Sequence, residues 1–365
     1  MVSVEEFLEE WNNASETVLV HTSGSTGEPK AMQVEKRRML ASARRTNDFL
    51  GLKEGDSALL CMSLDYIAGK MMVVRALERG LRLIVQEPSG HPLAATQRGQ
   101  SLCNPLRYSH EGQSPCVAGF AHEGQSPCVD FAAMVPLQVY NSLQVAEERE
   151  RLMQIRHLII GGGAIDEGLA ASLKDFPNAV WSTYGMTETL SHIALRRLNG
   201  PEASEWYTPF DSVRLSLSDE GCLVIDAPEV CATTLVTNDI AELRADGTFR
   251  ILGRKDNVIC SGGIKIQAEE LERQLRPHLR ESYLITKRPD DKFGEVVVLL
   301  TEGAVDEARQ VCERILPKYH QPRVYLHVDQ IPLTETGKPA RWQALSLLSD
   351  SNQRPRDYKS RALAN

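Results

Sequence analysis

The chain has 365 residues, a length that suggests two domains and allows a sizeable core. Acidic residues (49) outnumber lysines and arginines (41), so the formal charge is −8, which disfavours a protein that coats nucleic acid or binds membranes through basic patches. No stretch approaches the roughly 20 apolar residues of a membrane span, and Met1–Asn12 is acidic, unlike a secretion signal. The eight cysteines form no Cys-x-x-Cys pair, which disfavours a zinc site or disulfide framework and makes the reducing cytoplasm the expected location.

Short apolar runs alternate with helical patterns along the first two thirds of the chain, which predicts an α/β sheet. The expected strands are Thr17–Val20, Ala58–Met62, Leu81–Gln86, His157–Ile160 and Ala179–Ser182. The expected helices between them are Lys36–Leu50, Ala68–Glu78 and Asp166–Lys174. From about Val213 the pattern changes to strands separated by turn signals, with strands expected at Cys222–Ile225 and Phe249–Leu252.

A third pattern begins near Lys255 and predicts a compact α+β unit. Its expected elements are helix Ala268–Leu275, strands Ser282–Lys287 and Glu295–Leu300, helix Val305–Leu316 and strand Val324–Val328. We therefore expect a domain boundary near residue 255, between a large domain of residues 1–255 and a small domain of residues 256–365.

One segment of the large domain fits neither pattern. The octapeptide His-Glu-Gly-Gln-Ser-Pro-Cys-Val occurs at residues 110–117 and again at 122–129, within a stretch (96–129) that has no apolar periodicity. Two copies are too few for a repeat architecture. His110, Cys116, His122 and Cys128 are residue types that bind metals, but a tandem duplication that forms a mobile surface insertion is the favoured interpretation.

A loop rich in glycine and hydroxyl groups follows the first expected strand. It carries Thr22, Ser23, Gly24, Ser25, Thr26, Gly27 and Lys30. Glycines let backbone amides approach a phosphate, and hydroxyls and an ammonium add further donors. The Gly-x-x-x-x-Gly-Lys-Ser/Thr pattern of P-loop NTPases is absent. The segment therefore predicts a phosphate-binding loop of another kind.

This loop resembles the phosphate loop of the adenylate-forming superfamily, which includes acyl-CoA synthetases, luciferases and peptide-synthetase adenylation domains. Five further motifs follow in the order of that family: Gly161-Gly-Gly-Ala-Ile165, Tyr184-Gly-Met-Thr-Glu-Thr189, Thr237-Asn-Asp239, Gly253-Arg-Lys-Asp256 with Ser261-Gly-Gly-Ile-Lys-Ile266, and Thr334-Glu-Thr-Gly-Lys338. The resemblance implies a large α/β N-terminal domain and a small mobile α+β C-terminal domain. The family typically carries a longer segment ahead of the loop, so the start here is expected to be truncated.

The resemblance also implies an activity and the residues that perform it. A carboxylic acid would attack the α-phosphate of ATP, release pyrophosphate and leave an acyl-adenylate, whose acyl group would pass to coenzyme A. Positioning and charge neutralisation are the main tasks of the protein in such a reaction. By similarity, Lys338 bridges the carboxylate and the α-phosphate, Thr187 contacts phosphate and Glu188 holds Mg²⁺.

Similarity assigns the remaining residues of the expected nucleotide site. Gly161, Gly162, Gly163 and Ala164 would form the adenine-binding turn, with Tyr184 stacked on the adenine, and Asp239 and Arg254 would hold the ribose. Gly185 and Met186 would belong to the same ATP/AMP-binding site. Asp256 would be the hinge of the mobile domain, and Gly262 and Gly263 would meet coenzyme A.

The acid is suggested by a closer resemblance. Asp130–Gln138 and Gly185–Asn199 resemble the compact o-succinylbenzoate–CoA ligases of menaquinone biosynthesis. That acid keeps a second carboxylate, which needs a cation or several donors when buried. The family's His-x-x-Gly reads Tyr66-Ile-Ala-Gly69 here, and the candidate acid-binding residues are Tyr66, Lys70, Gln138, Ser191, His192 and Arg196. Lys70 as a surface lysine and His192 as a structural histidine are the alternatives.

Three other functions stay open beside this one. Another aryl- or fatty-acyl-CoA ligase would share the nucleotide motifs, but a fatty-acid pocket would have no use for Lys70. A stand-alone adenylation domain would load a carrier protein instead of free coenzyme A. A non-catalytic nucleotide-binding module is disfavoured by the intact Lys338, Glu188 and Asp239. The sequence leaves the oligomeric state open.

Overall fold

The computed structural model describes residues 2–21, 31–94, 129–163, 165, 167–333, 340–341 and 343–344. The expected phosphate loop with Thr22–Thr26, Gly27 and Lys30, the duplicated segment up to Cys128, Ala164 and Lys338 lie outside these residues.

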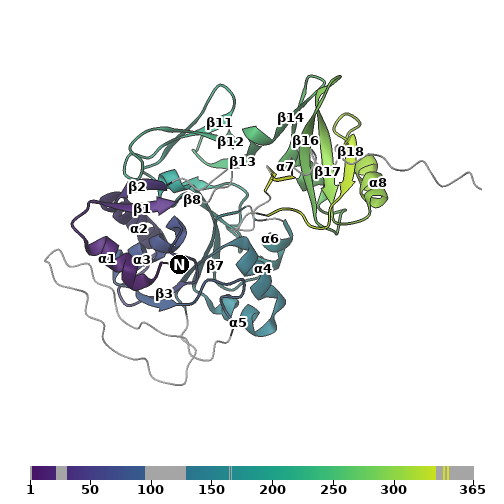
Figure 1. Ribbon diagram of the computed structural model, residues 1–365. Coiled ribbons are helices and arrows are strands. Elements are labelled where there is room, and N and C mark those ends of the chain that lie inside the picture. Colours follow the sequence, from purple (N-terminus) through teal and green to yellow (C-terminus); the bar gives the residue numbers. More distant parts are fainter. Residues whose placement is uncertain are drawn as a thin grey trace, which may run out of the picture.

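A seven-stranded sheet forms the centre of the large unit (Figure 1). Its strand order is β4 (Arg82–Val85), β3 (Ser57–Leu60), β5 (Phe131–Met134), β6 (His157–Ile160), β7 (Ala179–Gly185), β8 (His192–Arg197) and β9 (Thr208–Pro209). The strands from β4 to β7 are parallel, whereas β8 and β9 are antiparallel to their neighbours. The carboxyl ends of the parallel strands therefore meet at one edge, where open α/β sheets bind their ligands.

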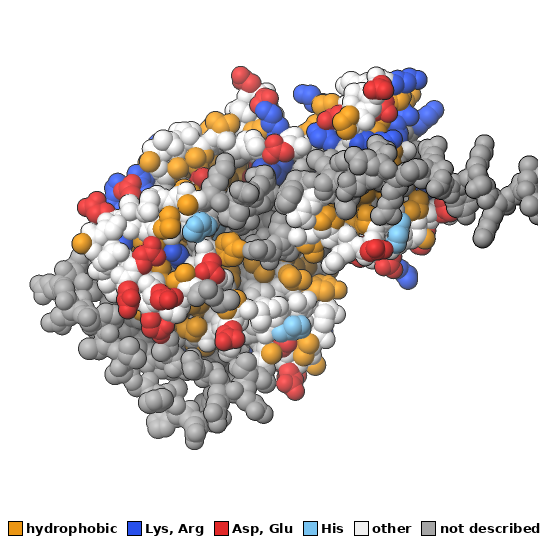
Figure 2. Space-filling view, viewed as in Figure 1, with side chains coloured by type: hydrophobic (Ala, Val, Ile, Leu, Met, Phe, Trp, Pro, Cys, Tyr) orange, Lys and Arg blue, Asp and Glu red, His pale blue; other side chains and the backbone are white. Residues whose placement is uncertain are grey.

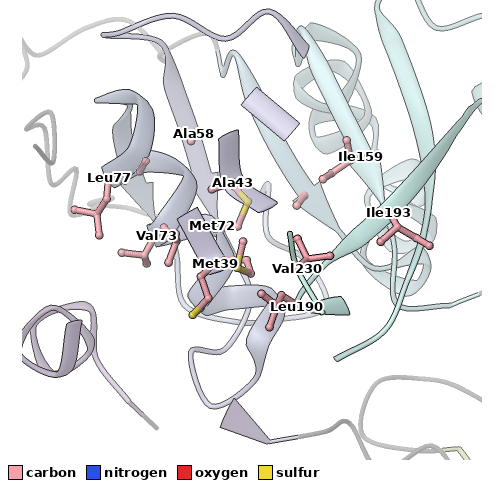
Figure 3. Close-up of a cluster of buried hydrophobic side chains, with 14 of the residues drawn as sticks. Met39, Ala43, Ala58, Met72, Val73, Leu77, Ile159, Leu190, Ile193 and Val230 are labelled. Carbon is pink, nitrogen blue, oxygen red and sulfur yellow. The ribbon is translucent and has the colours of Figure 1, made fainter. Parts of the chain in front are cut away.

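Two layers of helices cover the faces of this sheet. On one face lie α2 (Lys36–Leu50) and α3 (Ile67–Arg79), whose Met39, Ala43 and Met72 belong to the same buried cluster as Ile159 and Ile193 of the sheet (Figure 3). On the other face, α4 (Pro136–Gln144), α5 (Ala146–Gln154) and α6 (Glu167–Leu173) bury a second cluster. Alternate strand residues enter the two clusters, as expected for parallel strands buried on both faces.

Two smaller sheets belong to the same unit. β1 (Thr17–His21) pairs with β2 (Ala31–Glu35), and the short helix α1 (Val4–Asn12) packs Phe7 and Trp11 into the core. β10 (Arg214–Leu217), β11 (Cys222–Asp226), β12 (Leu235–Leu243) and β13 (Phe249–Arg254) form an antiparallel sheet.

The C-terminal elements build a separate five-stranded sheet with its own core (Figure 1). Its strands are β14 (Val258–Ser261), β15 (Ile264–Gln267), β16 (Tyr283–Asp290), β17 (Gly294–Thr301) and β18 (Val324–His327), and its helices are α7 (Ala268–Leu275) and α8 (Val305–Ile315). This sheet begins three residues after Lys255, where the sequence predicts the domain boundary. No helix among the described residues has the length and apolarity that crossing a membrane requires.

The elements expected from periodicity are found, with ends that differ by one to three residues. α2 and α7 have the expected bounds, whereas β7 continues to Gly185 instead of ending at Ser182 and β16 continues to Asp290 instead of Lys287. The continuation of β7 carries the aromatic-glycine motif into the edge of the sheet. The polar run at the expected end of β16 stays in the ladder because β17 supplies a partner for each of its residues.

Candidate active site

The turn after β7 is shaped by a close approach that only glycine permits. A Cβ atom on Gly185 would lie 2.2 Å from the carbonyl oxygen of Ser191 and 2.5 Å from Cα of His192. The Thr189 hydroxyl holds the turn, because it accepts the Met186 N–H at 3.0 Å and donates to the Ser191 carbonyl at 2.8 Å. Leu190 then takes a φ of 66°. The next strand therefore starts directly beside the end of β7.

This turn presents the two residues expected to meet the phosphates and the metal. Thr187 and Glu188 lie on a single 3-10 turn (Thr187–Thr189), with Thr187 half-buried and Glu188 exposed. Glu188 has no ion-pair partner in the part of the chain that the structure describes. An exposed carboxylate at the carboxyl edge of the sheet fits the way Mg²⁺ is usually held, by one or two carboxylates together with substrate phosphates.

The glycine turn after β6 lies at the same edge. The N–H of Gly161 donates to the Met134 carbonyl at 3.0 Å, and a Cβ atom there would lie 2.4 Å from the hydroxyl oxygen of Thr183. Gly162 has a φ of 80°, which glycine adopts readily. The turn thus runs close against β7 and leaves Gly162 exposed.

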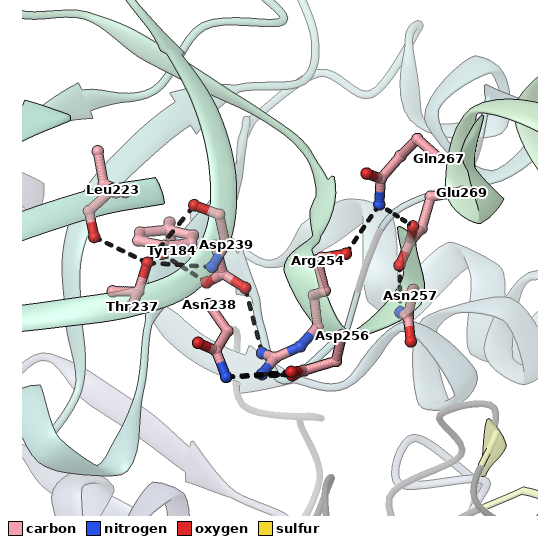
Figure 4. A network of polar contacts seen from close by, with 10 residues as sticks. All are labelled: Tyr184, Leu223, Thr237, Asn238, Asp239, Arg254, Asp256, Asn257, Gln267 and Glu269. Atoms are coloured by element: carbon pink, nitrogen blue, oxygen red, sulfur yellow. Dashed lines mark hydrogen bonds and ion pairs between the residues drawn. The ribbon is translucent and has the colours of Figure 1, made fainter. Parts of the chain in front are cut away.

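Three of the expected nucleotide residues form one polar cluster (Figure 4). The phenol of Tyr184 donates to Asp239 Oδ2 at 2.7 Å, and Arg254 Nη1 donates to Asp239 Oδ1 at 3.1 Å. The Asp239 N–H donates to the Thr237 hydroxyl at 3.1 Å, and that hydroxyl donates to the Leu223 carbonyl at 2.8 Å. Burial, followed by the charge of Asp239, raises the pKa of the Tyr184 phenol, so the O–H stays a donor. The carboxylate is thereby fixed with oxygen lone pairs left over for other donors.

The expected hinge residue is tied to this cluster. Asp256 Oδ2 accepts from Arg254 Nη2 at 3.2 Å and from Asn238 Nδ2 at 3.1 Å (Figure 4). It lies on a 3-10 turn (Lys255–Asn257) between β13 and β14. Gly253, just before it, leaves no room for a side chain, because a Cβ atom would lie 2.2 Å from Gln267 Nε2. The chain between β13 and β14 is therefore held by side-chain contacts on both sides.

Gly262 and Gly263 form the turn between β14 and β15. Their φ angles are 58° and 85°, values that L-residues with side chains rarely adopt. A Cβ atom on Gly262 would lie 3.2 Å from the ring of Phe293, while one on Gly263 would meet nothing within 4 Å. The tight turn alone explains both glycines, and their contact with coenzyme A stays a prediction.

Three of the residues expected to bind the acid are engaged elsewhere. Lys70 is buried, and its ammonium lies 3.1 Å from Glu10 Oε2 and 2.7 Å from the Leu19 carbonyl. Gln138 donates to the carbonyls of Cys61 and Ser89 at 3.0 and 2.9 Å. Arg196 lies at the far end of β8, where it donates to the Ser204 carbonyl at 3.3 Å. This geometry favours structural roles for Lys70 and Gln138 and separates Arg196 from His192.

Ser191 and His192 lie near a cation, Arg75, that the sequence analysis did not single out. Arg75, on the buried face of α3, is 2 % exposed and donates to the Ser191 hydroxyl at 2.6 Å. It forms no ion pair with any described carboxylate, and its Nε has no described acceptor. Burial lowers the pKa of Arg75 to about 10, so it remains a cation at neutral pH. Tyr66 precedes the same helix as its N-cap residue.

His192 lies beside this cation as a neutral side chain. It is buried, with Nε2 3.1 Å from the Thr46 hydroxyl and Nδ1 3.3 Å from the Ser191 hydroxyl. Burial, followed by the charge of Arg75, holds the pKa of His192 well below its ordinary value. The signal in the sequence that could have pointed to Arg75 is its place within the apolar run from Met71 to Leu77, because arginine is rarely fully buried without a partner.

Comparison with known proteins identifies the family. Residues 5–228 match the model of the AMP-binding enzyme family, which is more than half of the chain. The chain belongs to the AMP-binding enzymes. A 2-succinylbenzoate–CoA ligase of Listeria monocytogenes serotype 4b (strain F2365) is 24% identical over 91% of this chain and 70% of its own length.

Solved structures of AMP-binding enzymes agree with this assignment. An acyl-CoA synthetase (AMP-forming)/AMP-acid ligase II-like protein from Dyadobacter fermentans is 31% identical, with 93% of both chains covered and a TM-score of 0.58. An o-succinylbenzoate coenzyme A synthetase from Bacillus subtilis, in complex with ATP and magnesium ion, is 21% identical over 89% of this chain and 69% of its own, with a TM-score of 0.66. The expected adenylate-forming fold and the AMP-forming type of enzyme are thus confirmed.

The expected AMP-binding site would be assembled from residues far apart in the sequence. Glycines after β6, the aromatic turn after β7 and the Asp239–Arg254 pair of the antiparallel sheet all lie within the described residues. The phosphate loop and Lys338 lie outside them, so their roles stay predictions from the motifs.

Proposed function

We propose that this AMP-binding enzyme is an o-succinylbenzoate–CoA ligase. The curated relatives that carry the corresponding name cover more than nine tenths of this chain, and the buried, unpaired Arg75 supports a substrate with a second carboxylate. ATP and coenzyme A would be its co-substrates, and Mg²⁺ would be its metal ion. These co-substrates and the free state of the five described cysteines support a cytoplasmic location.

The first half-reaction would make the acid a better acyl donor. The aliphatic carboxylate attacks the α-phosphate of ATP, an acyl-adenylate forms and pyrophosphate leaves; the sulfur of coenzyme A then displaces AMP. In this proposal Lys338 neutralises charge between carboxylate and α-phosphate, Thr187 contacts phosphate and Glu188 holds Mg²⁺. Mg²⁺ supplies charge neutralisation on the phosphate oxygens.

Tyr184 and Asp239 fit their proposed places in the nucleotide site. The Tyr184 ring is held edge-on to Phe249, with ring centroids 5.1 Å apart, and its phenol is fixed by Asp239. A ring held in this way offers a pre-positioned apolar face for a purine. Asp239 keeps acceptor capacity for ribose hydroxyls, because each carboxylate oxygen has two lone pairs.

In this proposal Arg75 determines the specificity for the acid. A buried guanidinium without a carboxylate partner is costly, since ordinary proteins pair such charges. An aryl carboxylate placed beside Arg75 and Ser191 would supply the missing partner through a charged hydrogen bond. We propose Arg75, Ser191 and Tyr66 as the acid-binding set, with neutral His192 supporting Ser191. A fatty-acid pocket would gain nothing from this cation.

Substrate competition tests the proposal. Pyrophosphate release is measured with o-succinylbenzoate, benzoate, cinnamate and decanoate, with and without coenzyme A. We expect o-succinylbenzoate to have the highest kcat/KM, and Arg75→Lys to reduce its advantage over benzoate by roughly 10-fold or more, as expected for a lost charged hydrogen bond. Higher kcat/KM values for all three monocarboxylates would overturn the proposal, and pyrophosphate release without a CoA thioester would favour loading of a carrier protein.

Arg79→Lys is the matched control for this experiment. Arg79 lies on the same helix but its guanidinium pairs with Asp48 and donates to the Leu52 carbonyl at 2.8 Å, near the surface. The same chemical change there should leave the ratio between dicarboxylate and monocarboxylate unaltered.

A further inference from the structure

A pocket lies at the start of β7, away from the proposed nucleotide site. Its volume is about 310 Å³, and its wall includes Trp181 of β7 with Arg196 and Arg197 of β8. In the ladder, Trp181 is opposite Arg197, whereas Gly185 at the other end of β7 is opposite His192. Four residues of strand, roughly 13 Å, separate these two positions.

Aromatic side chains from three segments line this pocket. Phe49, at the end of α2, is 42 % exposed and meets Trp181 edge-to-face with ring centroids 4.9 Å apart. Trp206 comes from the segment between β8 and β9. The exposed Phe49 and its neighbour Trp181 offer an aromatic surface against which a planar ring can pack, whereas the guanidinium groups of Arg244 and Arg250 lie over the Trp206 ring.

Three arginines line the same pocket without described carboxylate partners. The Arg244 guanidinium lies 3.5 Å from the centroid of the Trp206 ring, and that of Arg197 lies 5.1 Å from the Trp181 ring. Arg196 Nε is buried and has no acceptor among the described residues. The neighbouring Arg250, by contrast, pairs with Glu242 at 2.7 Å. The pocket wall thus holds three guanidinium groups, of which Arg244 acts electrostatically on Asp246 of the same wall.

The net charge of the residues that line the pocket determines which anions it would favour. Glu202 and Asp246 also line the pocket, so its ionisable side chains sum to one net positive charge. The hydroxyl and the N–H of Thr248 both donate to Asp246, at 2.7 and 2.9 Å, and lower the pKa of that carboxyl. Asp246 is thus negative at neutral pH. One net positive charge matches a single carboxylate and disfavours a phosphate dianion or a nucleotide.

We propose that this pocket is a second binding site, which takes a small aromatic monocarboxylate. The ring would pack against Phe49, and the carboxylate would meet Arg196 and Arg244, whose guanidinium is held in place by the Trp206 ring. The site is distinct from the acid site proposed at Arg75, and the inference does not depend on which acid the enzyme activates.

Titration of the full chain with 2-naphthoate, monitored by calorimetry, tests this site. We expect saturable binding that Arg244→Gln and Trp206→Ala each weaken by about 10-fold, and that Arg75→Met leaves unchanged. Arg214→Gln is the matched control, because Arg214 is an exposed arginine that pairs with Asp226 outside the pocket. Arg244 is exposed, so its substitution should not affect folding.

Three further ligands define the chemistry. Cyclohexanecarboxylate keeps the charge without the aromatic ring, 2-naphthalenemethanol keeps the ring without the charge, and 2-naphthyl phosphate carries a second charge. We expect each to bind more weakly than 2-naphthoate. Binding that is unchanged by Arg244→Gln but lost in Arg75→Met would overturn the proposal, as would tighter binding of the phosphate or no saturable binding.

Discussion

The phenol of Tyr184 and the carboxylate of Asp239 lie 2.7 Å apart and join the central sheet to the antiparallel sheet. The same carboxylate accepts from Arg254, which also donates to Asp256. Three hydrogen bonds thus connect the proposed adenine-stacking residue to the proposed hinge. The orientation of the Tyr184 side chain and the position of Asp256 are therefore coupled through these hydrogen bonds.

Tyr184→Phe tests this connection, because it removes the phenol and keeps the ring. We expect the KM for ATP to rise by roughly 2- to 10-fold, as one lost hydrogen bond implies, with little change in the KM for the acid. Tyr283→Phe is the control, since the Tyr283 phenol donates to the Glu272 carbonyl at 2.6 Å within the small unit. Equal KM values for ATP in Tyr184→Phe and the unchanged enzyme would contradict the prediction.

Lys70 should contribute to stability rather than to the choice of acid. Its ammonium joins α3 to Glu10 of α1 and to β1, and it also lies 5.3 Å from the Phe7 ring centroid. Lys70→Met should lower the free energy of unfolding by about 1–3 kcal/mol, because a buried carbonyl and a carboxylate lose their donor. Urea unfolding measures this loss, and the ratio of dicarboxylate to monocarboxylate activity should not move. A changed ratio would restore Lys70 to the acid site.

The contacts of Lys70 and Arg75 show what the sequence could and could not predict. Periodicity located α2, because helix bounds depend on neighbouring residues. The partner of Lys70 is 60 residues away, and that of Arg75 is 116 residues away, so no local pattern indicated either contact. The helix α1 carries a Ser3–Glu6 capping box that the acidic composition obscured.

The geometry around the motif glycines follows from their residue type, whereas the contacts of the expected acid-binding residues do not. Gly185 and Gly161 are required by backbone approach, so the residue type itself reports the geometry. Gln138 and Arg196, in contrast, belong to types that serve equally well in structural hydrogen bonds. Their roles depend on which carbonyl lies nearby, which only the tertiary structure decides.

His192 makes a pH-dependent contribution to stability. Above a pH of about 6.5 both the folded and the unfolded chain hold a neutral imidazole, so the group contributes no pH dependence. Below it the unfolded chain binds a proton that the folded chain, with its lowered pKa, does not bind. Stability should therefore fall as the pH decreases, by up to about 1.4 kcal/mol per pH unit.

His192→Gln isolates this contribution from that of other histidines. The difference in unfolding free energy between the variant and the unchanged protein is measured at several values from about pH 7.5 to about pH 5.5. We expect the cost of the substitution to shrink as the pH falls, because only the unchanged protein loses stability through this group. A cost that is constant over the range would show that His192 is protonated in the folded state as well.

The hinge prediction concerns alternation of the small domain between the two half-reactions. If residues 256–365 rotate about Asp256, proline there fixes φ and should hold one orientation. Asp256→Pro should keep pyrophosphate release but slow thioester formation by roughly 100-fold, about 2.7 kcal/mol. Lys338→Ala should do the reverse and lose adenylation while it still forms thioester from supplied acyl-adenylate.

Asp256→Ala separates the hinge from the contacts that Asp256 makes. This variant loses the bonds from Asn238 and Arg254 but keeps free rotation about φ. Because rotation about φ stays free, we expect Asp256→Ala to retain both half-reactions within a few-fold, unlike Asp256→Pro. Rapid-quench measurement of each half-reaction distinguishes the variants. Loss of both half-reactions in equal proportion in Asp256→Pro and in Lys338→Ala, with folding intact, would rule out alternation about this residue.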